Sequence, residues 1–248
     1  KQIFRPLIPD VDFITFNNEA DLEKITTKTA GIILESIQGG AGFIEPQNDF
    51  LVKVKKRCEE VGALLIIDEI QPGFGRTGTL FGYENYNVVP DIVIIGKGMA
   101  GGMPVGGFIA NEKYMDLLSH NPKLGHITTF GGHPVIAAAC LATLQEIIEK
   151  DYAKQSLEKE KLFRSLLVHP LIKEIRGRGL MLAAMTESDT ITNEVILRCH
   201  KKGLVLFWLL FEGKAIRITP PLTISNEEIK KGCQIMLETL NEVQQEYK

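Results

Sequence analysis

Four short apolar runs, separated by helix-like and glycine-rich segments, constrain the fold of this chain most strongly. They span residues 31–35, 63–67, 91–95 and 107–110. The second and third do not alternate with polar residues, a pattern typical of strands that are buried on both faces. Buried strands separated by helices indicate a mostly parallel sheet covered by helices, so an α/β fold is expected.

Helical spacing accounts for two of the intervening segments. Apolar residues recur with this spacing over residues 51–61, with Asn48 or Asp49 available as an N-cap and Gly62 as a stop. A longer helix is expected from Pro134 to about residue 150, because proline suits the first helical turn.

The composition shifts beyond residue 150, where we expect a connector helix over residues 153–167 and then a smaller α+β unit. Its strands are expected at residues 180–183, 204–207 and 215–218. Its last helix begins at Ser225, and Glu228 completes a capping box. The chain is therefore divided into residues 1–150, part of a large domain, and residues 151–248, the connector and a small domain.

Composition excludes several classes of partner. The net charge is −3, and no basic stripe is present, which disfavours nucleic acid. No apolar run approaches the roughly 20 residues that span a bilayer. The cysteines form no Cys-x-x-Cys pair, so we expect reduced thiols in a cytoplasmic protein and no metal site. They are Cys58, Cys140, Cys199 and Cys233.

Residues able to carry chemistry follow three of the expected strands. Glu35 ends the first run, Asp68 follows the second, and Lys97 lies between two glycines after the third. Ligands gather at the carboxyl ends of parallel strands. Asp68 taken alone could be a helix cap or part of a loop ion pair, and Lys97 a solvated loop residue. The alternative is chemical: a carboxylate can keep a ring nitrogen protonated, and a partly buried lysine of lowered pKa can form a Schiff base with an aldehyde.

The motifs together resemble those of class III (ornithine/acetylornithine-type) aminotransferases, which have the fold type I architecture of aspartate aminotransferase. The Asp68 and Lys97 segments resemble the family signature and its Schiff-base lysine segment, and three further motifs follow in the family order. The matching segments are 65–78, 90–98, 128–134, 176–181 and 216–221.

The resemblance implies roles for individual residues. Lys97 would hold pyridoxal phosphate and then move the substrate proton, and Asp68 would pair with the pyridine nitrogen. Gln71 would lie near the phenolic oxygen of the ring. Thr129 would reach the cofactor phosphate of the partner subunit, since the family builds its sites across a homodimer interface. Arg217 would bind a substrate carboxylate through a bidentate contact.

Glu35 has two open interpretations. In the first, it lies near the cofactor or the substrate amine, behind the groups that bind them directly. In the second, it is a plain strand-end carboxylate.

Three positions depart from the family pattern. Ser36 stands where the family has proline, and His133 where it has asparagine. Gly40 replaces a glutamate that pairs, in many members, with the arginine matching Arg217. Arg217 should therefore stay available for carboxylates, and the identity of the amino donor stays open.

The chain is also shorter than family members at its N-terminal end. The resemblance implies that a glycine- and serine-rich phosphate-binding turn and an aromatic residue that stacks on the cofactor ring precede it. The chain is thus read as N-terminally truncated, and by itself it is expected to bind cofactor poorly.

The expected reaction moves an amino group from ornithine, N-acylornithine or a similar amino acid to 2-oxoglutarate. Two alternatives are a decarboxylase or aminomutase on the same fold, and a catalytically silent fragment or dimerisation module.

Overall fold

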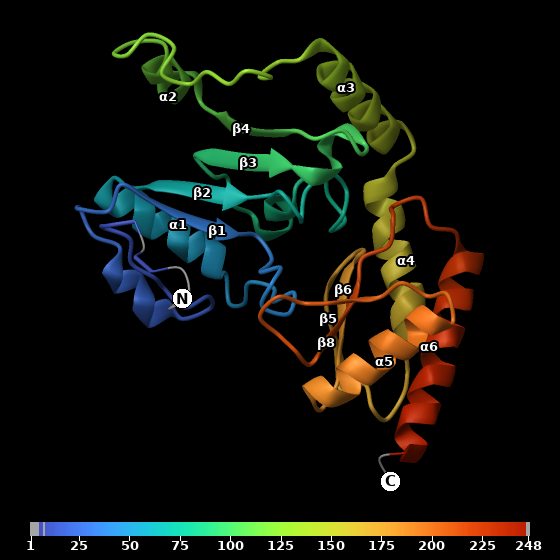
Figure 1. Cartoon of the computed structure of the whole chain (residues 1–248). Coiled ribbons are helices and arrows are strands. Elements are labelled where there is room, and N and C mark those ends of the chain that lie inside the picture. The colour runs from blue at the N-terminus through green and yellow to red at the C-terminus, as the bar shows by residue number, and fades with distance from the viewer. Residues whose placement is uncertain (1–4, 7, 247–248) are drawn as a thin grey trace.

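The strands of the described residues form two sheets that lie side by side and are linked by two helices (Figure 1). The structure is a computed structural model that describes residues 5–6 and 8–246. The linking helices are α3 (Pro134–Glu149) and α4 (Tyr152–Leu166). The expected division at residue 150 falls between them, and the assignment of two domains stays a prediction. None of the helices described combines the length and hydropathy needed to cross a membrane.

The first sheet has the strand order β1-β2-β3-β4. The first three strands are parallel, and β4 is antiparallel to β3. Their bounds are β1 (Gly31–Glu35), β2 (Leu64–Asp68), β3 (Ile92–Gly96) and β4 (Gly106–Ala110). The α/β fold with a mostly parallel sheet is therefore confirmed.

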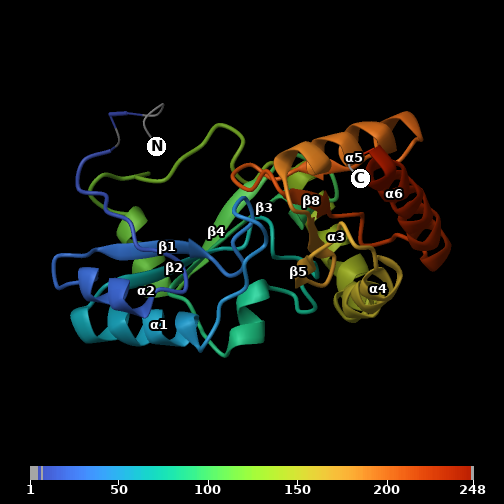
Figure 2. The same cartoon turned by 90° about the horizontal axis from the view of Figure 1, so that it is seen from below.

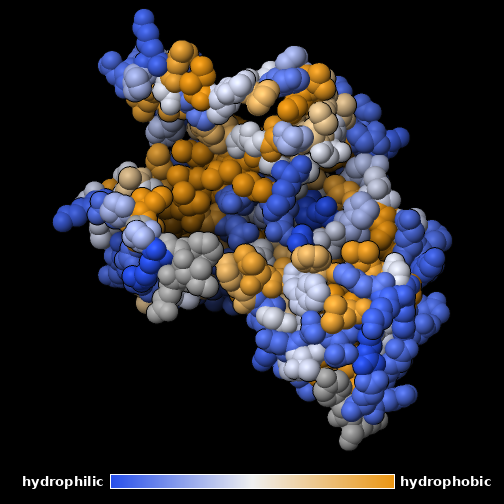
Figure 3. Space-filling view, viewed as in Figure 1, coloured by the Kyte–Doolittle hydropathy of each residue, from blue (hydrophilic) through white to orange (hydrophobic). Residues whose placement is uncertain are grey.

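The expectation that the central strands are buried on both faces is wrong for the described residues. Leu65 and Ile67 of β2 are fully buried against α1 (Phe50–Val61), which covers one face (Figure 2). Side chains on the opposite face are more exposed; Ile33 of β1 is 65% exposed. Figure 3 shows a hollow with an apolar surface beside this sheet. The strands are apolar on both sides, but helix α1 covers only one of them.

Helix α1 ends as expected and begins differently. Gly62 closes it in a left-handed conformation (φ 80°) that glycine adopts without strain. Asp49 precedes the helix, but its side chain makes no capping hydrogen bond. A capping side chain reaches the first free N–H groups of a helix from an extended backbone. The backbone of Asp49 is instead left-handed (φ 56°).

The second sheet has the strand order β5-β6-β8-β7, and every neighbouring pair is antiparallel. Helices α4, α5 and α6 pack against its buried apolar side chains. The bounds in this second unit are β5 (Glu174–Arg178), β6 (Met181–Met185), α5 (Asp189–Lys201), β7 (Phe207–Trp208), β8 (Ala215–Ile218) and α6 (Asn226–Glu246). A short helix, α2 (Glu112–Met115), follows β4 of the first sheet.

One expectation about this second unit is wrong, and two of its elements were not expected. The strand expected at 204–207 pairs only from Phe207 onward, because Leu204 still donates its N–H to Cys199 at the end of α5. Strand β5 and helix α5 were not predicted. The capping box of α6 is confirmed: Ser225 N donates to Glu228 Oε2 at 2.8 Å, and Glu228 N donates to Ser225 Oγ at 3.2 Å.

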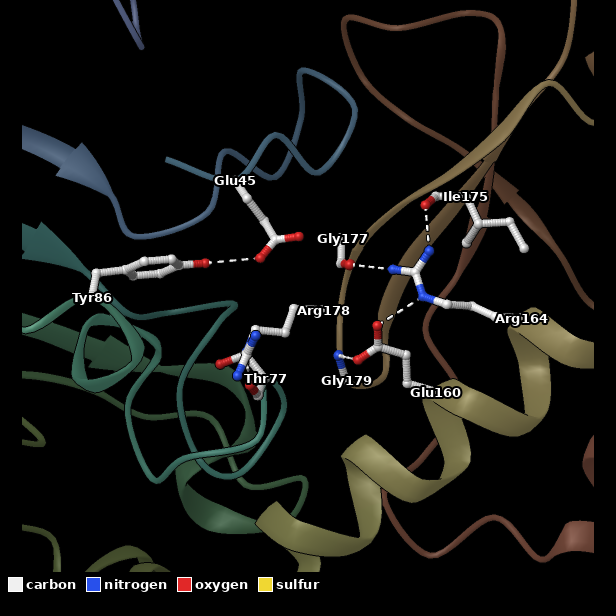
Figure 4. Close-up of polar contacts among 9 residues, drawn as sticks. All are labelled: Glu45, Thr77, Tyr86, Glu160, Arg164, Ile175, Gly177, Arg178 and Gly179. Atoms are coloured by element: carbon white, nitrogen blue, oxygen red, sulfur yellow. Dashed lines mark hydrogen bonds and ion pairs between the residues drawn. The ribbon is translucent and has the colours of Figure 1, made fainter. Parts of the chain in front are cut away.

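A polar cluster joins the two sheets at the turn between β5 and β6 (Figure 4). Arg178 Nε donates to Thr77 O at 3.1 Å, and Gly179 N donates to Glu160 Oε2 of α4 at 2.6 Å. Arg164 forms an ion pair with Glu160 at 2.8 Å. These contacts fix the loop after β2 against the second sheet, so residues of both sheets can contribute to one site.

Candidate functional site

Two carboxylates lie side by side at the carboxyl edge of the first sheet. Glu35 and Asp68 are direct partners in the register of the parallel strands β1 and β2, so they project from the same face. Glu35 Oε1 accepts a hydrogen bond from Gly39 N at 3.0 Å, and Asp68 Oδ1 accepts one from Ile70 N at 2.9 Å. The remaining oxygen of Asp68 has no hydrogen-bond donor among the described residues.

Lys97 directly follows β3 and opens a short 3-10 turn, η4 (Lys97–Ala100), with a left-handed backbone (φ 43°). It is exposed, and within the described chain it forms no ion pair or hydrogen bond. The expectation that Lys97 is partly buried is therefore wrong in the described part of the chain, because the cleft is open next to this side chain.

Burial and the neighbouring charges of Asp68 and Lys97 shift the pKa of Glu35. Burial raises the pKa of Glu35, and the Gly39 N–H lowers it; the Asp68 charge raises it and the Lys97 charge lowers it. The ammonium of Lys97 and the carboxylate of Asp68 both act on Glu35, so all three groups belong to one electrostatic environment.

An open cleft of about 710 Å³ collects the predicted residues from both sheets. Gln71, Lys97 and Arg217 all line it, together with Arg76. Its volume is in the range of sites that hold small molecules and cofactors. The structure therefore brings together three of the predicted residues here, with Glu35 and Asp68 at the neighbouring strand ends.

Two guanidinium groups share the cleft. Arg217 Nε donates to Thr219 Oγ1 at 3.0 Å, and Arg76 Nη1 donates to the backbone oxygens of Leu180 and Pro220. Burial, reinforced by the nearby Arg217 charge, lowers the pKa of Arg76 to about 10. Neither guanidinium has a carboxylate partner among the described residues, so this end of the cleft favours an anion.

Thr129 is not part of this arrangement. It lies exposed in the loop before α3 and does not line the cleft. The expectation for this residue concerns a partner subunit, and it stays a prediction.

A glycine turn holds Gln71 and Glu35 in place. A Cβ atom on Gly39 would lie 2.8 Å from Gln71 Oε1 and 2.8 Å from Glu35 Oε1. Both separations are too short for a real Cβ atom, so an alanine at this position would push the flexible ends of the two side chains aside. Gly39 was not predicted as a functional residue, because one of the two side chains that it accommodates, Gln71, is distant in sequence and the motif alone gave no signal.

We expect Gly39→Ala to displace the flexible ends of Gln71 and Glu35 and, by breaking the hydrogen bond from Gly39 N to Glu35 Oε1, to lower the free energy of unfolding by about 0.5–1.5 kcal/mol. Chemical denaturation monitored by circular dichroism measures this change. Gly106→Ala is the matched control, because the nearest atom to its added Cβ is 3.9 Å away. Equal stability of the two variants would contradict the steric account.

Glu69, beside Asp68, is a fully buried carboxyl group that sequence reasoning did not single out. It accepts hydrogen bonds from Gly82 N at 2.7 Å and Tyr83 N at 2.9 Å, and the hydroxyl of Ser36 lies next to it. Burial raises the pKa of Glu69 to about 7. Ser36, which replaces the family proline, is buried near this acid, but its hydroxyl has no hydrogen-bond partner among the described residues.

The raised pKa predicts a pH dependence of stability. Between pH 4.5 and about 7 the folded chain holds a proton on Glu69 that the unfolded chain releases. The contribution of Glu69 to stability therefore falls as the pH rises, by at most about 1.4 kcal/mol per pH unit. Glu69→Gln should flatten the wild-type slope in this window, as measured by urea unfolding at successive pH values. An unchanged slope would show that Glu69 does not titrate there.

Comparison with known proteins agrees with this geometry. The sequence pattern of the family described as "Aminotransferase class-III" matches residues 12–240. The chain belongs to the class III aminotransferase family. It is 37% identical to an acetylornithine aminotransferase of Caldanaerobacter subterraneus subsp. tengcongensis, over 97% of this chain and 61% of that protein. It is 38% identical to a putrescine aminotransferase of Pectobacterium atrosepticum, over 96% of this chain and 54% of that protein.

The solved structures agree with the sequence relatives. An ornithine aminotransferase from Toxoplasma gondii, with partial occupancy of PLP at its active site, superposes with a TM-score of 0.90 at 30% identity. The match covers 98% of this chain and 58% of that chain. The chain thus spans about three-fifths of the length of the relatives it matches.

Proposed function

We propose that this chain contributes the catalytic lysine and the carboxylate-binding arginine of a pyridoxal-phosphate-dependent aminotransferase. The amino group would move from ornithine, N-acylornithine or a similar amino acid to 2-oxoglutarate. One observation carries the proposal: Asp68 ends β2 and Lys97 directly follows the neighbouring parallel strand β3, and Lys97 shares a cleft with Arg217.

The residues present fit the cofactor. Lys97 offers an amine with no partner among the described residues, suited to covalent attachment of an aldehyde. Asp68 has one oxygen free of protein donors, suited to a protonated ring nitrogen. Gln71 lies in the same cleft with its side-chain oxygen close to Gly39, so its amide N–H groups could donate to the phenolic oxygen. When bound, pyridoxal phosphate supplies an electron-withdrawing ring beside the substrate carbon.

The roles of the protein groups follow from their chemistry. Lys97, once free of the cofactor, serves as the base that takes a proton from the substrate carbon and returns it to the cofactor carbon. Asp68 keeps the ring nitrogen protonated through its negative charge. Glu35, whose carboxylate accepts a hydrogen bond from Gly39 N, is proposed to act near the substrate amine.

Arg217 is proposed to bind the substrate carboxylate. Its guanidinium lines the cleft and has no acidic partner in the part of the chain described. A planar guanidinium binds a carboxylate through two parallel hydrogen bonds. Gly40, in place of the family glutamate, leaves this arginine available.

A homodimer with shared sites is also proposed, with Thr129 reaching the cofactor phosphate bound to the partner subunit. Exposed apolar side chains on α3 support an interface there, since large exposed apolar patches mark contacts between proteins. These are Val135, Leu141 and Ile148, each between 58% and 60% exposed. The four free cysteines support a reducing compartment, and we propose the cytoplasm.

Product analysis tests the reaction. The purified protein, supplied with a large excess of pyridoxal phosphate to offset weak binding, together with 2-oxoglutarate and an amino donor, should form glutamate in proportion to the donor consumed. Carbon dioxide release or intramolecular migration of the amino group, without glutamate, would instead indicate the decarboxylase or aminomutase alternative. No conversion of any donor, with cofactor attached to Lys97, would indicate a silent fragment.

A further inference from the structure

Arg76 uses fewer of its hydrogen-bond donors than Arg164, the arginine that ties α4 to β5. Arg164 donates through all three of its nitrogens, one to Glu160 and two to backbone oxygens (Figure 4). Arg76 donates through Nη1 alone, to Leu180 O at 3.2 Å and to Pro220 O. Its Nε and Nη2 have no hydrogen-bond partner among the described residues, although the side chain lines the cleft that holds Lys97.

The backbone contacts of Arg76 hold the segment that carries Arg217. Pro220 lies three residues after Arg217, and Thr219 Oγ1 accepts a hydrogen bond from Arg217 Nε at 3.0 Å. Leu180 N donates to Arg76 O at 2.9 Å, so the side chain and the backbone of Arg76 both bind Leu180. Arg76 therefore fixes the loop after β8 against the turn between β5 and β6, and with it the position of Arg217.

The guanidinium groups of Arg76 and Arg217 repel each other. Burial, together with the charge of Arg217, lowers the pKa of Arg76. Glu146 of α3 also lines the cleft, but it accepts a hydrogen bond from Tyr152 and forms no ion pair with either arginine in the part of the chain described. Two neighbouring cations that lack a carboxylate partner are stabilised when an anion binds beside them, because its charge offsets their repulsion.

Resting on the proposed function, we infer that Arg76 is a positioning residue for the carboxylate bound by Arg217. It holds the loop that follows Arg217, and it adds a second positive charge beside the bound carboxylate. The acceptor 2-oxoglutarate benefits most, because it carries two carboxylates and no ammonium group. An amino donor benefits less, since the same charges repel its ammonium group.

Equilibrium binding of glutarate tests this inference without turnover. Glutarate has the two carboxylates of 2-oxoglutarate but neither its carbonyl group nor an amine, and it is titrated calorimetrically into the purified chain without cofactor. Arg76→Gln keeps an N–H donor and removes the charge, so it should weaken glutarate binding by about fivefold, as for the loss of one partly exposed ion pair. Arg76→Lys keeps the charge and should remain within about twofold of the wild type.

Ionic strength provides a second measure of the charge. The difference in affinity between the wild type and Arg76→Gln should shrink as the salt concentration rises from about 0.01 M to about 1 M, because the Debye length falls from about 30 Å to about 3 Å. A structural role alone would leave this difference unchanged.

Arg178→Gln is the matched control. Arg178 also joins the loop after β2 to the second sheet, since its Nε donates to Thr77 O and to Asn85 Oδ1, both at 3.1 Å. It does not line the cleft. Its replacement should lower stability and preserve the wild-type affinity for glutarate.

The outcomes separate this inference from the proposed function. Loss of glutarate binding in Arg217→Met, together with wild-type affinity in a folded Arg76→Gln, would overturn the inference alone, as would an equal loss in Arg178→Gln. If Arg76→Gln does not fold, Arg76→Lys decides, and a loss of about fivefold or more in that variant would overturn the inference. Unchanged binding in Arg217→Met, or no binding by the wild type, would overturn the carboxylate site of the proposed function and this inference with it; pyridoxyl labelling of Lys97 tests the lysine separately.

Discussion

Lys97→Ala is expected to lower the transamination rate by at least about 10⁴-fold. The substitution removes both the amine that holds the cofactor and the base that moves the substrate proton, and positioned proton transfer alone contributes about 10²–10⁴-fold. The rate of glutamate formation from 2-oxoglutarate measures the loss. The variant should remain folded, because Lys97 is exposed and contributes no packing.

Lys159 provides the comparison for this experiment. It is only 8% exposed, its Nζ donates to Leu222 O at 2.6 Å, and burial lowers its pKa. By burial alone it is the better candidate for a tuned amine. Lys159→Ala should lower stability and leave the chemistry in place. Near-normal turnover in Lys97→Ala, or a selective loss of turnover in Lys159→Ala, would refute the assignment.

Asp68→Asn is expected to lower turnover by about 10²–10³-fold, comparable to the loss of one preorganised electrostatic contact to a transition state. A neutral amide cannot keep a ring nitrogen protonated, so the ring accepts negative charge less readily. Single-turnover kinetics of the amino-transfer half-reaction measures the effect on chemistry apart from substrate binding.

Asp91→Asn is the matched control. Asp91 also adjoins the first sheet, but it forms an ion pair with Lys55 at 2.9 Å and accepts a hydrogen bond from Leu65 N. Its replacement should reduce stability without a specific effect on the half-reaction. If Asp68→Asn reacts as fast as Asp91→Asn, then Asp68 does not act on the cofactor.

Much of the first sheet could be predicted from sequence because local signals agreed there. Each strand is a short apolar run, Gly62 ends α1, and the carboxylates are the last residues of β1 and β2. The parallel register then places Glu35 beside Asp68. The small unit was predicted less well: β5 contains two arginines and a glycine, which do not form an apolar run.

The site was only partly predictable, since its missing features depend on contacts between distant segments. Arg76 lies within the signature motif, but its position against Leu180 and Pro220 depends on the packing of the two sheets. The apolar run at 204–207 was read as a strand. Pairing begins only at Phe207, which leaves several of these side chains exposed.

Borohydride reduction followed by peptide mapping tests the central claim most directly. The protein is incubated with pyridoxal phosphate, reduced, digested and analysed by mass spectrometry. The account predicts that the pyridoxyl group is attached to Lys97, and that Asp68→Asn weakens the attachment without moving it. Attachment to Lys159 or to another lysine, with Lys97 unmodified, would contradict the account.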